Sequence, residues 1–199
     1  AHQRTQQTFP DLSTANYTYD NISQLKVGDS SSAPEDRGYL YDTAWNLSKR
    51  TNNGVVTTFS VDVKNQLTSV GGLSCTYDSN GNLTSRVYDS NGPKTYSYGY
   101  DDENQLISAA TDTYYTPAAS RWKTEFVYDG RMRCRKRIES TWNTGSGAWQ
   151  VAYELRYVYD GMRVIQDRDS GNTPTVAYTR GSDLSGSLEG AGGIGGLLA

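Results

Sequence analysis

Apolar and polar residues alternate with a period of two along much of the chain. In one such run Tyr96, Tyr98 and Tyr100 alternate with Ser97 and Gly99, so that in an extended strand the three tyrosines project from one face. No segment has the period of about 3.6 residues that marks an amphipathic helix. The alternating runs are short and end in residues typical of turns, and this pattern predicts an all-β chain of antiparallel hairpins.

A four-residue phrase returns along the chain: an aromatic or apolar residue, any residue, tyrosine, and aspartate. Clear copies end at Asp20, Asp42, Asp78, Asp101, Asp129 and Asp160. A degenerate copy ends at Asp62, where Val61 replaces the tyrosine. Neighbouring aspartates are 16 to 31 positions apart, and the larger steps lie toward the C-terminus. This spacing predicts one hairpin per copy, with insertions in the later copies.

Each aspartate of the phrase stands where a strand has to turn. An aspartate carboxylate at such a position can accept hydrogen bonds from main-chain amides two residues further on. We therefore expect Asp20, Asp42, Asp78, Asp101, Asp129 and Asp160 to be structural turn caps and not catalysts. The sequence Asp78-Ser79-Asn80-Gly81 predicts a type I turn closed by a left-handed glycine. The pairs Asn53-Gly54, Asp129-Gly130 and Asp160-Gly161 predict two-residue hairpin turns.

The phrase is seen best at residues 77–84, Tyr-Asp-Ser-Asn-Gly-Asn-Leu-Thr, and there it resembles the YD repeat of rearrangement-hotspot (Rhs) proteins. The resemblance covers roughly residues 17–165. The stretch 178–187, which runs into the glycine-rich residues 190–199, is similar to the core region associated with that family. The resemblance implies a curved strip or part of a β-shell, a hollow wall that encloses or presents a toxin. A self-cleaving aspartyl site at a DPxG motif follows the core region in the family, but this sequence has no DPxG, so that role passes to no residue here.

We expect three regions: an N-terminal lead-in over residues 1–16, a YD-repeat array over 17–180 and a glycine-rich core-region segment over 181–199. The apolar residues Ile194, Leu197 and Leu198 are expected to dock on a sheet of this chain or of a neighbouring one.

Composition changes this picture in a few respects. Only 35% of the residues are hydrophobic, and sixteen tyrosines stand beside three phenylalanines, which favours half-buried strands over a thick core. The formal net charge of -3 provides no field for nucleic acid, and no apolar run approaches the roughly 18 residues of a membrane helix.

Alternation places Cys75 with Leu73 and Tyr77, and Cys134 with Met132, in one inward layer. Buried thiols and a disulfide both remain open.

Other motifs favour structural interpretations. His2 is the only histidine and lies at an N-terminus, so neither a catalytic triad nor a histidine metal site is expected. Asp101, Asp102 and Glu103 are interpreted as turn residues. The run Gly190 to Gly195 matches GxGxxG but lacks the strand and helix of a dinucleotide site. In the basic run Arg131 to Ile138, pairing with acidic residues across the strands is favoured over a phosphate or nucleic-acid site. We expect no catalytic residue, cofactor or metal ion.

The predicted function is a non-catalytic segment of a secreted or cell-surface bacterial protein, part of an Rhs-type shell whose partners are other shell segments or toxin cargo. One alternative is an extracellular fibre or surface-layer module that assembles with copies of itself by edge pairing or strand donation. A second is a cell-surface carbohydrate-binding module using exposed tyrosine and tryptophan. Four Asn-x-Ser/Thr sequons, at Asn16, Asn21, Asn46 and Asn82, leave glycosylation open.

Overall fold

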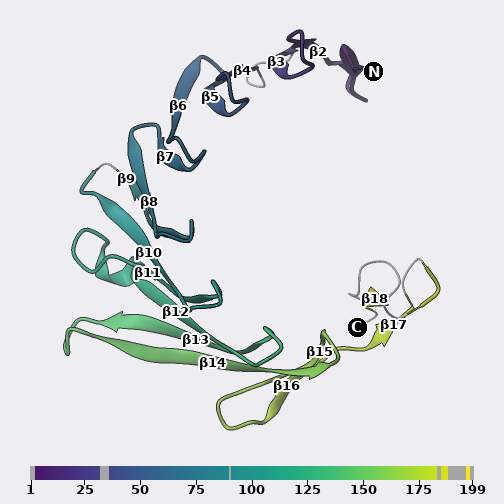
Figure 1. Cartoon of the computed structure of the whole chain (residues 1–199). Coiled ribbons are helices and arrows are strands. Elements are labelled where there is room, and N and C mark those ends of the chain that lie inside the picture. Colours follow the sequence, from purple (N-terminus) through teal and green to yellow (C-terminus); the bar gives the residue numbers. More distant parts are fainter. Residues whose placement is uncertain (1–2, 32–35, 90, 183–184, 188–195, 198–199) are drawn as a thin grey trace. The chain divides into compact units, whose positions relative to one another are not determined.

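A computed structural model describes residues 3–31, 36–89, 91–182, 185–187 and 196–197. The chain divides into two compact units, unit 1 over residues 1–81 and unit 2 over residues 82–199. Figure 1 labels most of the strands of both units.

Unit 1 contains eight strands. They are β1 (Gln6–Thr8), β2 (Thr14–Tyr19), β3 (Leu25–Ser30), β4 (Arg37–Tyr41), β5 (Leu47–Asn52), β6 (Val55–Val61), β7 (Leu67–Val70) and β8 (Leu73–Tyr77). Each strand pairs antiparallel with the next along the chain, so that unit 1 is a meander of hairpins.

Unit 2 continues the same pattern with longer strands. They are β9 (Leu83–Asp89), β10 (Lys94–Tyr100), β11 (Leu106–Thr111), β12 (Trp122–Tyr128), β13 (Cys134–Asn143), β14 (Ala148–Asp160), β15 (Arg163–Arg168), β16 (Pro174–Ala177), β17 (Arg180–Gly181) and β18 (Gly196–Leu197). Strands β9 to β16 pair antiparallel in chain order, and β17 pairs separately with β18. A 3₁₀ turn, η1 (Ala118–Ser120), lies between β11 and β12. The all-β, meandering antiparallel fold predicted from the sequence is confirmed.

The sheets are one layer thick and bury few side chains fully. Among the described residues the buried hydrophobic side chains are Ala15, Cys75, Ala109 and Leu155. Most tyrosines are half buried and pack on neighbouring strands; for example, the rings of Tyr88 and Tyr96 stack at 4.2 Å. Contacts between adjacent strands therefore carry most of the packing.

The structure also decides several details. Cys75 and Cys134 are free thiols; Cys75 is buried and Cys134 is half buried. The prediction that Met132 shares a layer with Cys134 is wrong, because β13 begins at Cys134 and Met132 lies in the preceding turn, 65% exposed.

Leu197 lies in β18, with its backbone paired to Arg180. Ile194 and Leu198 lie outside the described residues. None of the described helical segments has the length and apolarity needed to cross a membrane.

Candidate functional site: the repeated aspartate turn

The aspartate turns of both units share one five-residue backbone. The amide of the first residue donates to the carbonyl of the fifth, the amide of the fourth donates back to the carbonyl of the first, and the fourth residue has a positive φ. Complete copies of this backbone start at Phe9, Asp20, Asp42, Asp62, Asp101, Asp129 and Asp169. At Asp78 the amide of Gly81 donates to the Asp78 carbonyl, and Gly81 has φ 88°. This is a type I turn followed by a left-handed bulge residue, the usual three-residue hairpin connection.

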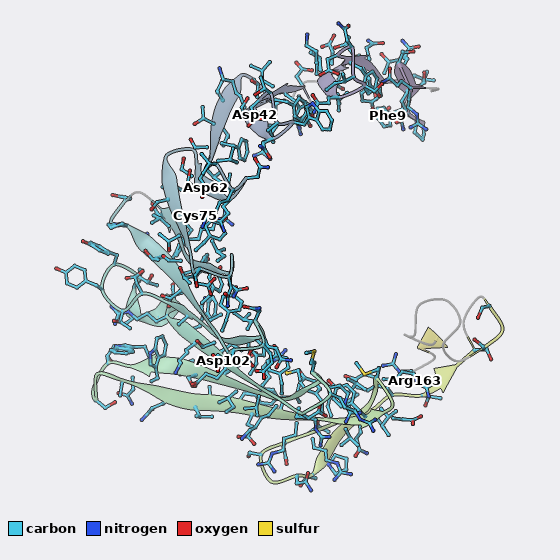
Figure 2. All side chains as sticks on the ribbon, in the orientation of Figure 1. Phe9, Asp42, Asp62, Cys75, Asp102 and Arg163 are labelled. Carbon is cyan, nitrogen blue, oxygen red and sulfur yellow. The ribbon has the colours of Figure 1, made fainter. Side chains whose placement is uncertain are left out.

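The aspartate side chain closes the turn from inside. Oδ1 of Asp20 accepts hydrogen bonds from the amides of Ile22, at 3.0 Å, and Gln24, at 2.8 Å. The same two bonds recur at Asp42, Asp62, Asp101 and Asp129. Oδ1 of Asp78 accepts from the amide of Asn80 at 2.9 Å. Asp42 and Asp62 mark two of these hairpin ends in unit 1 (Figure 2).

Two predicted turns differ in detail. Asp160 is the last residue of β14 and pairs with Arg163, so the turn residues are Gly161 and Met162. Its carboxylate lies 2.8 Å from the Arg163 guanidinium. The two-residue turn predicted at Asp129-Gly130 is wrong, because that segment adopts the five-residue backbone. The two-residue turn predicted at Asn53-Gly54 is confirmed, with φ values of 48° and 78° between the paired residues Asn52 and Val55.

Hydrogen bonds keep at least two of these carboxylates ionised. The side chain of Arg133 donates to Asp129 at 2.7 Å and, together with the turn amides, lowers the pKa of Asp129 to about 2. The side-chain and backbone amides of Asn46 likewise hold the pKa of Asp42 below its ordinary value. An ionised carboxylate is the stronger acceptor for the turn amides.

In three copies of the repeat, the tyrosine before the aspartate ties its hairpin to the one before it. The Tyr77 hydroxyl donates to the carbonyl of Leu67 at 3.0 Å, and the Tyr128 hydroxyl donates to that of Leu106 at 3.0 Å. In each case the acceptor is the residue just after the preceding turn. Tyr159 makes the same bond at 2.7 Å to Cys134, which replaces the leucine. We call this contact the tyrosine latch.

The latch acts where main-chain pairing has stopped. Between β11 and β12 the ladder ends at the pair Ser108 and Glu125, so the last residues of β12 lie beyond it. The Tyr128 hydroxyl supplies a hydrogen bond to β11 in that region. A tyrosine hydroxyl is protonated at neutral pH, and burial raises the pKa values of Tyr77, Tyr128 and Tyr159 further.

The remaining positions of the phrase also make repeated contacts. The Asn46 side-chain amide donates to Asn65 of the next turn at 3.0 Å, and Asn82 donates to Asn104 at 2.7 Å. Hydroxyl side chains two positions after these amides bond across their own hairpins: Ser48 donates to the Leu40 carbonyl, and Thr68, in the equivalent place, to the Ser60 carbonyl, each at 3.1 Å. Nearly every position of the phrase is thus explained by a structural contact.

Between successive hairpins, each unit has a groove beside the turns, and the two grooves are built alike. Their volumes are about 330 Å³ in unit 1 and about 480 Å³ in unit 2. The first is lined by Asp20, Ile22, Gln24, Lys26, Tyr39, Leu40, Tyr41, Asp42, Thr43 and Trp45. The second is lined, position for position, by Asp101, Glu103, Gln105, Ile107, Phe126, Val127, Tyr128, Asp129, Gly130 and Met132. The groove is therefore a product of the repeat.

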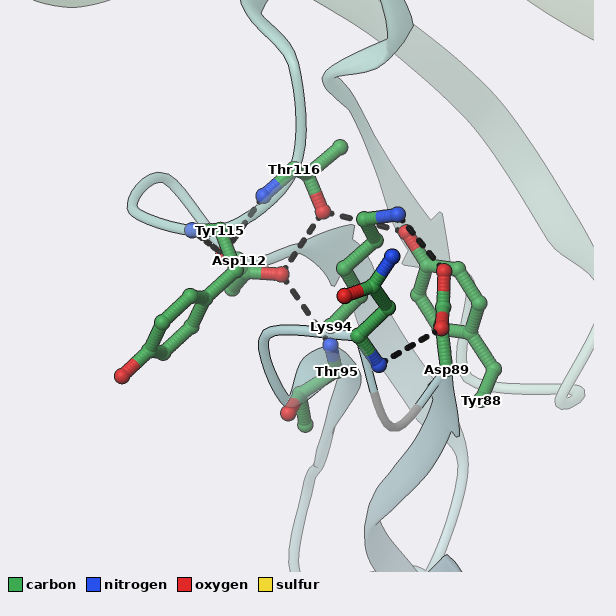
Figure 3. Close-up of polar contacts among 8 residues, drawn as sticks. Tyr88, Asp89, Lys94, Thr95, Asp112, Tyr115 and Thr116 are labelled. Carbon is green, nitrogen blue, oxygen red and sulfur yellow. Dashed lines mark hydrogen bonds and ion pairs between the residues drawn. The ribbon is translucent and has the colours of Figure 1, made fainter.

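A second polar cluster fixes the insertion between β11 and β12 (Figure 3). Asp112 accepts hydrogen bonds from the amides of Thr95, Tyr115 and Thr116 and from the Thr116 hydroxyl. Partial burial opposes its charged form, but these bonds outweigh burial and hold the pKa of Asp112 well below its ordinary value. Thr116 is 1% exposed and also bonds the Tyr88 hydroxyl. Sequence reasoning missed this cluster, because Asp112 belongs to no copy of the repeat.

In chemical terms these carboxylates serve as acceptors for turns. Asp101 and Asp129 line the same groove, but each binds the amides of its own turn. The arrangement positions hairpins along a strip.

The comparisons with known proteins agree with this geometry. Residues 77–117 match the family model of the RHS repeat. The chain is 29% identical over 182 residues to the tRNA nuclease WapA of Bacillus subtilis (strain 168), and equally to the tRNA3(Ser)-specific nuclease WapA of Bacillus spizizenii. Each match covers 90% of this chain and 6% of the relative.

A solved structure shares the fold. A chain in the crystal structure of TcdB2-TccC3-Cdc42 superposes with a TM-score of 0.55 at 15% identity, over 87% of this chain and 11% of that chain. Residues 77–117 thus contain an RHS repeat, and the repeated tyrosine and aspartate phrase and the meandering sheet of this chain are similar to those of Rhs, or YD-repeat, proteins.

Proposed function

We propose that the chain is a structural, non-catalytic segment of a secreted or surface-exposed protein, forming part of the wall of an Rhs-type shell that encloses or presents a toxin or effector. The tyrosine latch carries this proposal. The same bond joins hairpin to hairpin at Tyr77, Tyr128 and Tyr159. A contact that recurs between successive hairpins in three copies of the repeat suits a wall built by adding hairpins.

The thinness of the sheet supports the same role. A single layer with few buried hydrophobic side chains leaves sheet surface that neighbouring wall segments or cargo would cover. Rhs-type partners, namely further shell segments and a toxin, are therefore the partners that we propose.

Nuclease activity is not part of the function that we propose for this chain. Two relatives are named tRNA nucleases, but this chain spans only 6% of their length. We assign any nuclease activity to parts of such proteins outside the segment described here. Purified chain incubated with tRNA should leave the tRNA intact, whereas cleavage that a point substitution in this chain abolishes would contradict a structural role.

Enclosure is tested in the protein that carries this segment with its flanking sequences. Replacing Tyr77, Tyr128 and Tyr159 together with phenylalanine removes three latches and should expose the effector to added protease. A Tyr114→Phe variant is the matched control, because Tyr114 is 82% exposed and should leave protection unchanged. Equal protease resistance in the wild type and the triple variant would argue against a wall held by latches.

A second function, self-assembly by edge pairing, is favoured by β16. All four residues of this strand are exposed, and among the described strands it pairs only with β15. However, β16 starts at Pro174, and proline in an edge strand hinders pairing with a further strand. This residue therefore favours the shell over self-assembly. Sedimentation of the purified chain separates the two: a concentration-independent monomer fits a wall segment, and growth with concentration fits self-assembly.

A further inference from the structure

Three basic side chains form a row across strands β13, β14 and β15 of unit 2. The register pairs Lys136 with Arg156 and Arg156 with Arg168. Directly paired residues of antiparallel strands project from the same face. These strands are neighbours in Figure 1, and paired strands lie about 4.8 Å apart. The three cations are therefore close neighbours on one surface, an arrangement that costs stability unless an anion compensates it.

The surrounding side chains compensate the row only in part. Glu154 accepts a hydrogen bond from Nε of Arg156 at 2.7 Å and lies 3.5 Å from Nζ of Lys136. Nε of Arg168 donates to the uncharged side chain of Gln166 at 2.7 Å. No ion pair found among the described residues includes Arg168. One carboxylate, shared by Lys136 and Arg156, thus compensates a row of three positive charges.

The row is accessible to a ligand. The Lys136 side chain is 33% exposed and that of Arg156 is 39% exposed. At its ends the register places Val127 beside Lys136 and Pro174 beside Arg168, and both end residues are exposed. Neither the row nor its two flanking residues includes an aromatic side chain, so these positions offer no ring on which a nucleobase could stack.

We propose that the Lys136–Arg156–Arg168 row binds a polymeric phosphate through charge alone. Guanidinium groups fit phosphate oxygens with two parallel hydrogen bonds, which a lysine cannot do. An extended acidic peptide presents carboxylates on one face about 6.6 Å apart, a poorer match to a row with steps of about 4.8 Å than a flexible chain of phosphates. This inference is independent of the proposed shell.

The test uses the full 199-residue chain and inorganic polyphosphate, with binding measured by calorimetry over a range of salt concentrations. The logarithm of the affinity should fall linearly with that of the salt concentration. Arg156→Gln and Arg168→Gln should each weaken binding several-fold and reduce the salt slope by about one. Arg86→Gln is the matched control, since Arg86 is exposed on β9, outside the row, and should leave the slope unchanged.

The substitution Glu154→Gln gives the opposite result and excludes a merely structural effect. It removes the one carboxylate that Lys136 and Arg156 share, and should tighten polyphosphate binding although it loses two ion pairs. Circular dichroism of each variant checks that the sheet is retained. Unchanged or weaker binding by a folded Glu154→Gln variant would overturn the proposal, as would absence of polyphosphate binding to the wild type at low salt.

Two further probes identify the chemistry. If an oligothymidylate has the same affinity per phosphate as polyphosphate, this result supports recognition of phosphate alone. Oligothymidylate binding that persists at high salt would show base contacts and contradict recognition by charge alone. Poly-L-glutamate of matched charge should bind more weakly, and equal or tighter binding would make an acidic peptide the partner instead.

Discussion

The hydroxyl of Tyr128 donates a hydrogen bond of 3.0 Å to the carbonyl of Leu106. The bond joins β12 to β11 beyond the point where main-chain pairing between these two strands ends. The tyrosine and the leucine of the YD phrase are thereby parts of one contact, made between consecutive copies. This explains why a polar aromatic residue serves at this position, since phenylalanine would fill the same space without the donor.

Removing this donor gives the first prediction. Tyr128→Phe should lower the free energy of unfolding by about 1 kcal/mol, the usual net contribution of one hydrogen bond, as measured by urea denaturation. Tyr114→Phe, at an exposed site, should have no measurable effect. Equal effects of the two substitutions would show that the latch contributes no stability.

The Asp129 turn predicts a dependence of stability on pH. The pKa of Asp129 is about 2 in the folded chain, below the value near 3.9 of an unfolded aspartate. Its contribution is therefore fully present above about pH 4 and is lost as the pH falls toward 2. Urea denaturation from pH 5 to pH 2 should show a smaller loss for Asp129→Asn than for the wild type. Parallel curves would contradict this role.

Backbone strain predicts a stabilising substitution at Trp45. This residue has φ 68° and is 70% exposed, whereas Asn65 and Asn104 hold the equivalent place in other turns. Because asparagine tolerates the left-handed region better, Trp45→Asn should raise the free energy of unfolding by up to about 1 kcal/mol and with it the melting temperature. Gly81→Ala, at φ 88°, should lower it by a similar amount. A destabilised Trp45→Asn would instead reveal stabilising contacts of the indole.

Gly92 and Tyr115 lie so close together that substitutions at the two positions should have coupled effects on stability. A Cβ added at Gly92 would lie 2.8 Å from Cδ1 of Tyr115, and Gly92 has φ 70°. Gly92→Ala should therefore destabilise the chain by about 1–3 kcal/mol. In a Tyr115→Ala background the same change should cost less, because only the backbone strain remains. Additive effects in thermal unfolding of the double variant would exclude the steric contact.

Local chemistry explains what could be predicted from the sequence. Alternation with a period of two and an aspartate at each strand end identified an all-β meander and the turn positions of Asp20, Asp42, Asp78, Asp101 and Asp129, because these depend on residues only a few positions apart. The same reasoning put the Asp160 turn one residue early and placed Met132 in a strand, because bulges shift the alternation by one residue and no local pattern marks them.

The tertiary structure decided how the hairpins are joined. Tyr128 and Leu106 are 22 positions apart, and the basic row unites Lys136, Arg156 and Arg168 from three strands. Which residues face each other depends on the register between strands, and the register is set by the turn lengths and bulges of the folded chain. The sequence by itself therefore determined the repeated hairpin and its aspartate turn. The latches, the Asp112 cluster and the basic row exist only because folding brings distant residues into one register.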